Sequence, residues 1–253
     1  MELYTIYSTS EEVVRPFIIN DEQRMMTQMY AWSKHENEHI RRLSSEGCRP
    51  QLPWAKALVK YKNDPTPILP ILEELKADTS LYVRKSVANN LNDISKTHPD
   101  LVINIAEKWL KNDDKHTNWI VKHGCRTLLK QANSKVLALF GYHDSSSILV
   151  DDFSVDKTIV AIEENITFSF GISATEATKV RLEFGVDYVK ANGKRNRKIF
   201  QISETQLKNH ENKSYSKKHA FVDLSTRKHY TGFHSITLIV NGAERGTLDF
   251  ELV

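Results

Sequence analysis

Three cations recur at matching positions of a weak internal repeat. Arg42, Lys85 and Lys122 each follow an aliphatic residue by two positions. The aliphatic residues lie 43 and 37 residues apart in the chain and are, in order, Ile40, Val83 and Ile120. A row of cations neutralises the phosphates of a nucleic acid, although scattered cations on a helix are ordinarily a solvated face. Their recurrence at one position of the repeat favours a polyanion-binding surface.

The spacing of this repeat indicates the elements that carry the cations. A period of about 40 residues is typical of HEAT-type helix pairs, which stack into an α-solenoid. From about Asp21 to Tyr142 apolar residues recur at helical spacing. Examples are Trp54, Leu58, Val59 and Tyr61, and then Ile68, Ile71, Leu72 and Leu75. We therefore predict an all-helical first half, whose second helices line one concave face and bear the basic row.

The second half of the chain changes to a pattern of alternating apolar and polar residues. After about Ser145 this alternation predicts strands, most clearly at 166–170, 180–184 and 235–240. Asn192-Gly193 and Asn241-Gly242 favour hairpin turns, because Asn and Gly tolerate positive φ. Six or seven strands in about a hundred residues predict a β-sandwich of immunoglobulin type. The fold class is thus multidomain α + β, with a solenoid at 1–144 and a β-sandwich at 145–253.

Basic residues of the β half gather in two short clusters. One contains Lys194, Arg195 and Arg197, and the other is Lys217-Lys218. Such loops can simply keep a domain soluble, but beside a basic solenoid they favour a surface that closes around a polyanion. The net charge of the chain is +3, so this inference depends on where the charges lie.

Several classes of protein are disfavoured by what the chain lacks. Cys48 and Cys125 are far apart and have no metal-ligand spacing, which argues against a structural zinc or a disulfide framework. The sequence contains no glycine-rich phosphate loop, and we expect neither a metal nor a cofactor. It begins without a basic segment leading into an apolar stretch, and long apolar runs are missing. We predict a monomeric cytoplasmic protein.

Five strings of this sequence resemble, in order, the AlkC branch of the HEAT-like alkylpurine DNA glycosylases. They are Arg41–Trp54, Tyr82–Ile94 and Thr117–His123 in the helical half, and Val189–Lys194 and Val240–Gly242 in the β half. The resemblance implies that the solenoid holds bent duplex DNA in its concave face while the immunoglobulin-like domain approaches from the other side. It also implies removal of 3-methyladenine, and of 3-methylcytosine, without rotating the lesion into a pocket.

That reaction needs negative charge and a held water. A base methylated at N3 is cationic, so its N-glycosidic bond is already weak, and its departure leaves an oxocarbenium-like sugar. The resemblance assigns the carboxylates to Asp93, Glu11 and Glu46. Each has an ordinary alternative: Asp93 as a solvent-facing helix residue, Glu46 as a helical partner of Arg42, and Glu11 as part of an acidic pair. Glu12 leaves open which member of that pair points inward.

The resemblance also implies contacts with DNA. Trp54 closes a string with two prolines, and its ring faces either the damaged nucleotide or the core. The expected phosphate contacts are Arg42, Lys85, Lys122, His123 and Arg126, and further DNA or lesion contacts are Asn89, Asn90 and Trp119. No lysine stands out as a Schiff-base nucleophile, so the expected enzyme is monofunctional.

Two other functions stay open at this stage. The chain begins at a segment that in the family follows further helices, so we expect part of the solenoid to be missing. A non-catalytic DNA-binding scaffold is therefore one alternative. The other is a HEAT protein-interaction module, which would expose apolar stripes on the concave face where this sequence has cations.

Overall fold

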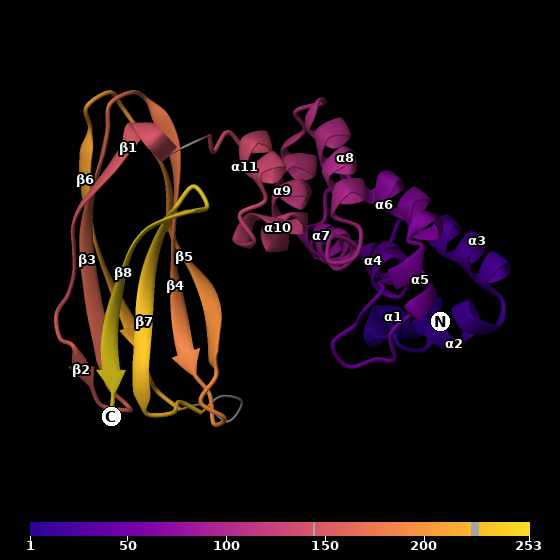
Figure 1. Cartoon of the computed structure of the whole chain (residues 1–253). Helices are drawn as coiled ribbons and strands as arrows, with labels where there is room; N and C mark the ends of the chain where they lie inside the picture. Colours follow the sequence, from indigo (N-terminus) through magenta and orange to yellow (C-terminus); the bar gives the residue numbers. More distant parts are fainter. Residues whose placement is uncertain (144, 224–227) are drawn as a thin grey trace. The chain divides into compact units, whose positions relative to one another are not determined.

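The computed structural model describes residues 1–143, 145–223 and 228–253 (Figure 1). These residues form two compact units, Met1–Leu129 and Lys130–Val253. Asp144, at the predicted domain boundary, lies outside the described residues, and that boundary stays a prediction. Within the described ranges, no helix is both long and apolar enough to cross a membrane.

The first unit is helical. Its elements are α1 (Glu2–Tyr7), α2 (Val14–Asn20), α3 (Glu22–Trp32), α4 (Glu38–Glu46), α5 (Val59–Asn63), η1 (Thr66–Ile68), α6 (Leu69–Leu75), α7 (Leu81–Ile94), α8 (Pro99–Leu110), α9 (Lys115–Gly124) and α10 (Arg126–Lys130). Side-chain caps define several starts, because the first backbone N–H groups of a helix need acceptors. Asn37 accepts from the His39 N–H at 2.8 Å, and Asp114 accepts from the Thr117 N–H at 2.8 Å.

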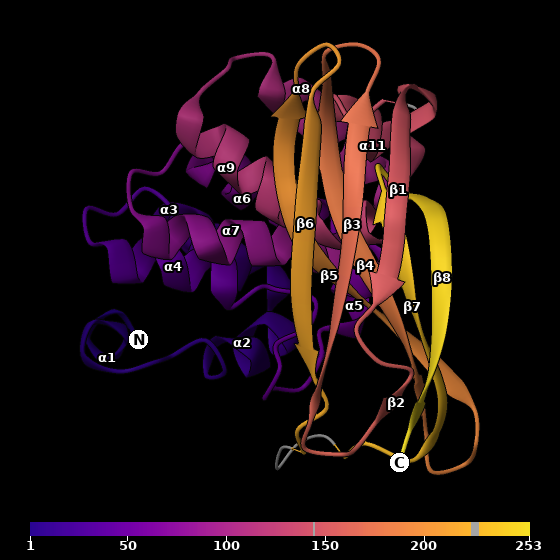
Figure 2. The ribbon, with the colours of Figure 1, turned by 90° about the vertical axis from the view of Figure 1, so that its left-hand side faces the viewer.

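Helices α4, α7 and α9 form one layer, in which each packs against the next (Figure 2). Helices α3, α6 and α8 each pack against the helix that follows in this layer. Ser45 and Ser86 join α4 to α7 through their hydroxyls at 2.6 Å. Where α9 crosses α7, a Cβ at Gly124 would lie 3.0 Å from the Leu91 Cβ, so this glycine permits a close approach. The three predicted second helices therefore lie side by side.

The predicted repeat register is confirmed by burial. Ile40, Val83 and Ile120 are 2%, 0% and 0% exposed and occupy equivalent inward positions of α4, α7 and α9. One part of the helical prediction is wrong, because Trp54 does not lie on a helix. It belongs to the loop between α4 and α5, where Pro50 and Pro53 lack the N–H groups that a helix requires.

The described part of the second unit contains a short α-helix, a 3₁₀ turn and a β-sandwich. Its elements are α11 (Ser134–Leu139), η2 (Ser145–Ser147), β1 (Ile148–Val155), β2 (Ile159–Val160), β3 (Asn165–Ala174), β4 (Thr178–Val189), β5 (Arg195–Leu207), β6 (Asn212–Ala220), β7 (Gly232–Val240) and β8 (Ala243–Leu252). One sheet has the order β1-β3-β6, with these three strands side by side in Figure 2, and the other has the order β2-β8-β7-β4-β5. All pairings are antiparallel except β2 with β8.

Alternating side chains of the two sheets form the core of this unit. Phe168, Phe184 and Phe250 are at most 2% exposed and belong to one apolar cluster. Both predicted hairpin turns are confirmed. Gly193 has a φ of +73° in the turn between β4 and β5, and Asn241 and Gly242 have φ of +47° and +82° in the turn between β7 and β8. Two sheets over a shared core confirm the predicted sandwich. The described residues form eight strands, one more than the six or seven expected, because of the short β2.

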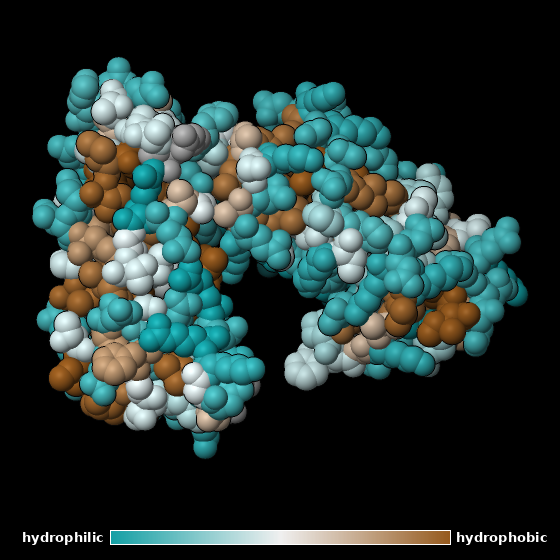
Figure 3. All heavy atoms as spheres, in the orientation of Figure 1, coloured by the Kyte–Doolittle hydropathy of each residue, from teal (hydrophilic) through white to brown (hydrophobic). Residues whose placement is uncertain are grey.

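The surface of the helical unit is largely polar. Figure 3 shows mainly hydrophilic residues on the drawn face of this unit, interrupted by smaller hydrophobic patches. Exposed aromatic side chains do occur, and Trp54 is 94% exposed.

Candidate active site and nucleic-acid interface

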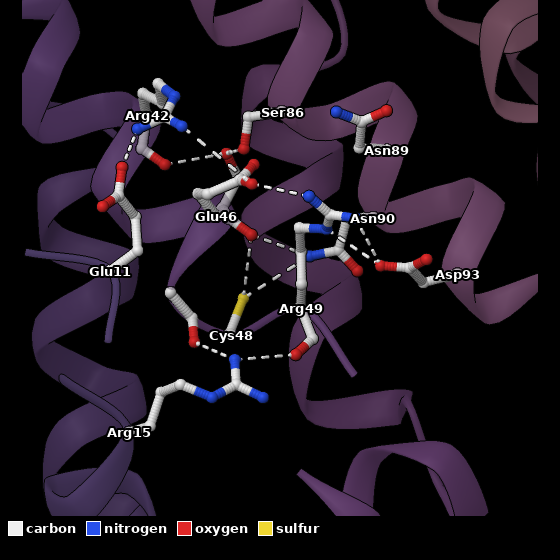
Figure 4. A network of polar contacts seen from close by, with 12 residues as sticks. Glu11, Arg15, Arg42, Glu46, Cys48, Arg49, Ser86, Asn89, Asn90 and Asp93 are labelled. Carbon is white, nitrogen blue, oxygen red and sulfur yellow. Dashed lines mark hydrogen bonds and ion pairs between the residues drawn. The ribbon is translucent and has the colours of Figure 1, made fainter. Parts of the chain in front are cut away.

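Three carboxylates and two arginines alternate in one series of polar contacts (Figure 4). They come from the turn before α2, from α4 and the loop that follows it, and from α7. Arg42 pairs with Glu11 and lies 4.0 Å from the Glu46 Oε1. Arg49 contacts both remaining carboxylates. Its Nη1 donates to Glu46 Oε1 at 2.6 Å, and its Nε donates to Asp93 Oδ2 at 2.9 Å. We call Glu11, Arg42, Glu46, Arg49 and Asp93 the charge ladder.

The three carboxylates are nearly removed from solvent. Glu11, Glu46 and Asp93 are 9%, 7% and 7% exposed. Charges inside a protein interact more strongly than charges in water. The three carboxylates therefore act electrostatically on any charge that enters the site. The ladder therefore brings the three predicted carboxylates together in one nearly buried site.

Glu11, not Glu12, points inward. Glu11 lies in the turn before α2 and binds Arg42, whereas Glu12 is exposed. The structure therefore resolves the choice that the sequence left open. Glu46 is held mainly by Arg49 and lies farther from Arg42, its predicted helical partner.

Asp93 occupies the penultimate position of α7. A carboxylate there meets the negative end of the helix dipole, which disfavours it. Arg49 offsets that cost, and so does Lys96, whose Nζ is 2.9 Å from Asp93 Oδ1. The interpretation of Asp93 as a solvent-facing residue is wrong, since it is buried.

Arg15 fastens the loop that carries Trp54. It is 2% exposed, and it donates to the carbonyls of Gly47, Arg49 and Lys56 at 3.0, 3.0 and 2.8 Å. Both ends of the loop are thus fixed to α2, while Trp54 at its tip projects into solvent. The interpretation of Trp54 as a core residue is therefore wrong.

A second group of predicted residues gathers on α7, α9 and α10. Trp119 and His123 stack with ring centroids 4.0 Å apart. Arg126 donates to Asn89 Oδ1 at 3.0 Å and to the His123 carbonyl at 2.7 Å. Lys85 and Lys122 lie on α7 and α9 near this pair. We call Lys85, Asn89, Trp119, Lys122, His123 and Arg126 the basic cluster.

The basic cluster perturbs its histidine. Burial lowers the pKa of His123 below its usual value, and the positive charges of Arg126, Lys122 and Lys85 lower it further. Its imidazole is therefore neutral at pH 7. Asp93 and Arg49 both act electrostatically on Arg126, so the basic cluster adjoins the charge ladder.

Two predicted DNA contacts need correction. Asn90 is fully buried, and its amide donates to the Ser45 carbonyl at 2.8 Å, so it joins α7 to α4 and does not reach DNA. Arg195 and Arg197 lie on β5 and Lys217-Lys218 lies on β6, so the basic clusters belong largely to strands and not to loops. Arg197 is bound by Asp187 at 2.7 Å and by Glu244, which neutralise its charge. Lys194 and Arg195 remain exposed.

Sequence reasoning missed Arg49, Arg15 and Lys96. Both arginines are buried, and a buried cation needs hydrogen-bond acceptors or a counter-charge. Arg15 donates to the Lys56 carbonyl 41 residues away and Arg49 binds Asp93 44 residues away, contacts that no local pattern reveals. The one available signal was that Arg49 lies inside a string that carries the family resemblance.

Cys48 lies beside the ladder but is not a nucleophile. Burial raises the pKa of its thiol to about 12, and its Sγ donates to the Ser44 carbonyl. Among the described residues, no group of three or more His, Cys, Asp and Glu side chains could hold a metal ion.

Comparisons with known proteins match both units. Residues 4–128 match the family described as DNA alkylation repair enzyme, and residues 149–253 match the C-terminal Ig-like domain of YhaZ. The uncharacterized protein YhaZ of Bacillus subtilis is 51% identical over 252 residues, which cover 100% of this chain and 70% of that protein.

A solved structure gives the same result. The Pseudomonas fluorescens alkylpurine DNA glycosylase AlkC, bound to DNA containing an abasic site analog, superposes with a TM-score of 0.94 at 39% identity. The match covers 99% of this chain and 70% of AlkC. This chain therefore belongs to the DNA alkylation repair enzyme family, in the group that carries a YhaZ-type C-terminal Ig-like domain.

Proposed function

We propose that this protein is a monofunctional DNA glycosylase that removes cationic N3-methylated bases from duplex DNA. The observation that carries the proposal is the charge ladder, in which Glu11, Glu46 and Asp93 converge from three segments of the chain. The relative AlkC was solved with DNA containing an abasic site analog, and an abasic site is what a glycosylase leaves. The substrate would be 3-methyladenine and, as a second lesion, 3-methylcytosine.

The reaction follows from the charge of the lesion. The bond between C1′ and the methylated base breaks, its electron pair neutralises the departing base, and C1′ becomes oxocarbenium-like. Carboxylates stabilise that positive charge, and Asp93 is placed in our scheme to accept a proton from the water that attacks C1′. The products are a free base and an abasic site. Because negative charge can act on the stacked base through space, the scheme needs no rotation of the lesion.

A monofunctional reaction fits the setting of Lys96. A lyase step would require a neutral amine to attack C1′ of the abasic sugar. Lys96 is the lysine beside Asp93, and its ammonium is held by that carboxylate at 2.9 Å. Borohydride should therefore trap no covalent complex with abasic DNA.

The basic cluster and the exposed cations of the β unit would bind the phosphates. Arg42 pairs with Glu11, and its Cζ lies 4.5 Å from the centroid of the Tyr82 ring. To bind a phosphate, Arg42 must therefore release Glu11. Its side chain retains 19% exposure, which permits the exchange. A DNA-directed role would locate the protein in the bacterial cytoplasm.

The test is base release by the full chain from a methylated duplex, together with duplex binding at rising salt. The proposal expects free 3-methyladenine and an affinity that falls steeply with salt, because phosphate contacts release counterions. Salt-sensitive binding without base release would instead indicate the scaffold, and salt-insensitive or absent binding would indicate the protein-interaction module.

Trp54→Ala should slow base release without destabilising the fold. The ring is 94% exposed, so its loss removes little packing. A Trp face beside a cation contributes about 0.5–2 kcal/mol, which corresponds to about a 2- to 30-fold fall in rate. The measurement is single-turnover release at saturating DNA. Tyr7→Ala, which removes another exposed ring at 83% exposure, is the matched control. Equal rates for wild type and Trp54→Ala would remove Trp54 from the site.

His123 should make DNA binding depend on pH. Its lowered pKa leaves it neutral in the free protein, whereas a nearby phosphate would raise that pKa. Binding then takes up a proton, so affinity rises as the pH falls through the bound-state pKa and levels off below the free-state pKa. Each unit of pKa difference gives about a tenfold gain.

The measurement is the dissociation constant for duplex DNA between pH 8 and pH 5. His123→Gln should flatten the curve, whereas His116→Gln, on the same helix, should leave it unchanged. If His123→Gln retains the full pH dependence, His123 does not contact phosphate.

A further inference from the structure

Arg49 is the member of the charge ladder that contacts two carboxylates at short range. Its Nη1 is 2.6 Å from Glu46 Oε1, and its Nη2 is 2.8 Å from Asp93 Oδ2. These two carboxylates come from α4 and α7, hence from two different repeats. The side chains of Arg49, Glu46 and Asp93 are 9%, 9% and 5% exposed. One guanidinium therefore sets the relative position of two buried acids.

The main chain of Arg49 is fixed as well. Its carbonyl accepts from Arg15 Nη1 at 3.0 Å, and its N–H donates to the Glu46 carbonyl at 3.2 Å. The other two cations around the carboxylates are freer, since the Arg42 and Lys96 side chains are 19% and 48% exposed. Arg42 and Lys96 can turn toward DNA phosphates, whereas Arg49 has no comparable route to solvent.

Arg49 must also offset repulsion within the site. Two carboxylates in a partly dry site repel one another and would separate if no cation lay between them. Burial lowers the pKa of the Arg49 guanidinium, but Glu46 and Asp93 raise it by more, so the group stays charged. The remaining charges around Arg49 are those of Arg15, Arg42, Glu11, Lys96 and Arg126.

We propose that Arg49 is a positioning residue of the glycosylase site, which bridges Glu46 and Asp93 and holds both oxygens toward the reacting sugar. The bridge leaves the trio with a net negative charge, as a cationic transition state requires. Arg49 itself touches neither DNA nor base. Its effect on rate rests on the proposed function, whereas the bridge is a property of the protein alone.

The first experiment compares Arg49→Ala and Arg49→Lys with Arg41→Ala in the full chain. Arg41 lies on α4 next to Arg42, and it forms a comparably close bidentate pair with Asp78, at 2.7 and 3.1 Å, outside the ladder. We expect Arg49→Ala to lower the single-turnover rate at saturating methylated DNA by about 100-fold, with little change in DNA affinity. Guanidinium ion, compared with sodium at equal ionic strength, should restore part of that rate. Arg49→Lys should be intermediate and Arg41→Ala unchanged.

A purely structural role gives a different result. Loss of rate in both Arg49 variants without rescue by guanidinium would overturn the proposal, as would an equal loss in Arg41→Ala. If Arg49→Ala does not fold, the rate of Arg49→Lys tests the proposal by itself. Lysine keeps the positive charge but lacks the planar guanidinium that bridges the two carboxylates. Wild-type rate in that variant would contradict the inference.

The second experiment does not depend on activity. In the arginine Nε–H region of a ¹H–¹⁵N spectrum, the Arg49 signal is identified by its loss in Arg49→Lys. Exchange of this proton with water should be slow in the wild type and faster in Asp93→Asn, because Nε donates to Asp93. If wild type releases no base, the glycosylase proposal fails, and this exchange still decides whether the bridge exists. Fast exchange in the wild type would overturn the bridge.

Discussion

Asp93→Asn should lower the rate of base release at saturating DNA by at least about 100-fold, the scale expected for losing a positioned charge or base. Asparagine keeps the shape of the side chain but removes its negative charge. The Arg49 and Lys96 cations, at 2.8 and 2.9 Å, would then face the developing oxocarbenium with one carboxylate fewer. DNA affinity should stay the same or rise slightly, since a negative charge near the phosphates is lost.

The matched control for this variant is Asp78→Asn. Asp78 also binds an arginine in a bidentate pair and has a side chain that is 5% exposed, but it lies outside the charge ladder. This change should leave the rate within about threefold of wild type, since the site keeps its charges. Comparable rates for Asp93→Asn and wild type, in single-turnover assays, would show that Asp93 is not part of the chemistry.

Arg181→Met should destabilise the β unit by about 3–5 kcal/mol, the cost of breaking a buried ion pair. Arg181 is 3% exposed on β4 and binds Glu183 and Glu204, each at 2.6 Å. Without the guanidinium, Glu183 is an uncompensated charge at 1% exposure. In a unit of this size, the loss corresponds to a fall of about 10 °C or more in the melting temperature. Differential scanning calorimetry of the full chain measures it.

Two further variants separate charge from packing. Arg197→Met removes an arginine with a side chain that is 34% exposed, and it should cost about 1 kcal/mol or less. Replacing both members of the buried pair, as Arg181→Met with Glu183→Leu, should recover most of the lost stability, because apolar pairs of similar size substitute well for buried ion pairs. An unchanged melting temperature in Arg181→Met alone would contradict this account of the β unit.

The repeat and the sandwich could be predicted because both depend on local patterns. Ile40, Val83 and Ile120 mark the register of three helices, since an inward position must be apolar in each repeat. Arg42, Lys85 and Lys122 follow these residues by two positions and therefore lie on the layer formed by α4, α7 and α9. Asn241-Gly242 predicts its hairpin for an equally local reason, because the turn requires positive φ. The three carboxylates were found only through the family resemblance.

The parts that failed depend on distant contacts. Trp54 matched a helical spacing, but two prolines and the Arg15 hydrogen bonds hold that segment as a loop. Asn89 and Asn90 are adjacent and of the same type, so the sequence does not distinguish them. In the structure, Asn90 is buried and binds the Ser45 carbonyl, whereas Asn89 accepts from Arg126. Arg49 is separated from Asp93 by 44 residues, so its bridge appears only when α4 and α7 are packed.

The most direct test of the proposed glycosylase is the identity of the bases that the full chain releases from duplex DNA carrying both cationic and neutral methylated lesions, measured by mass spectrometry. Carboxylates that stabilise positive charge should release 3-methyladenine and leave the neutral O⁶-methylguanine in place. Release of no base, or of cationic and neutral lesions alike, would contradict the assignment of the charge ladder to this reaction.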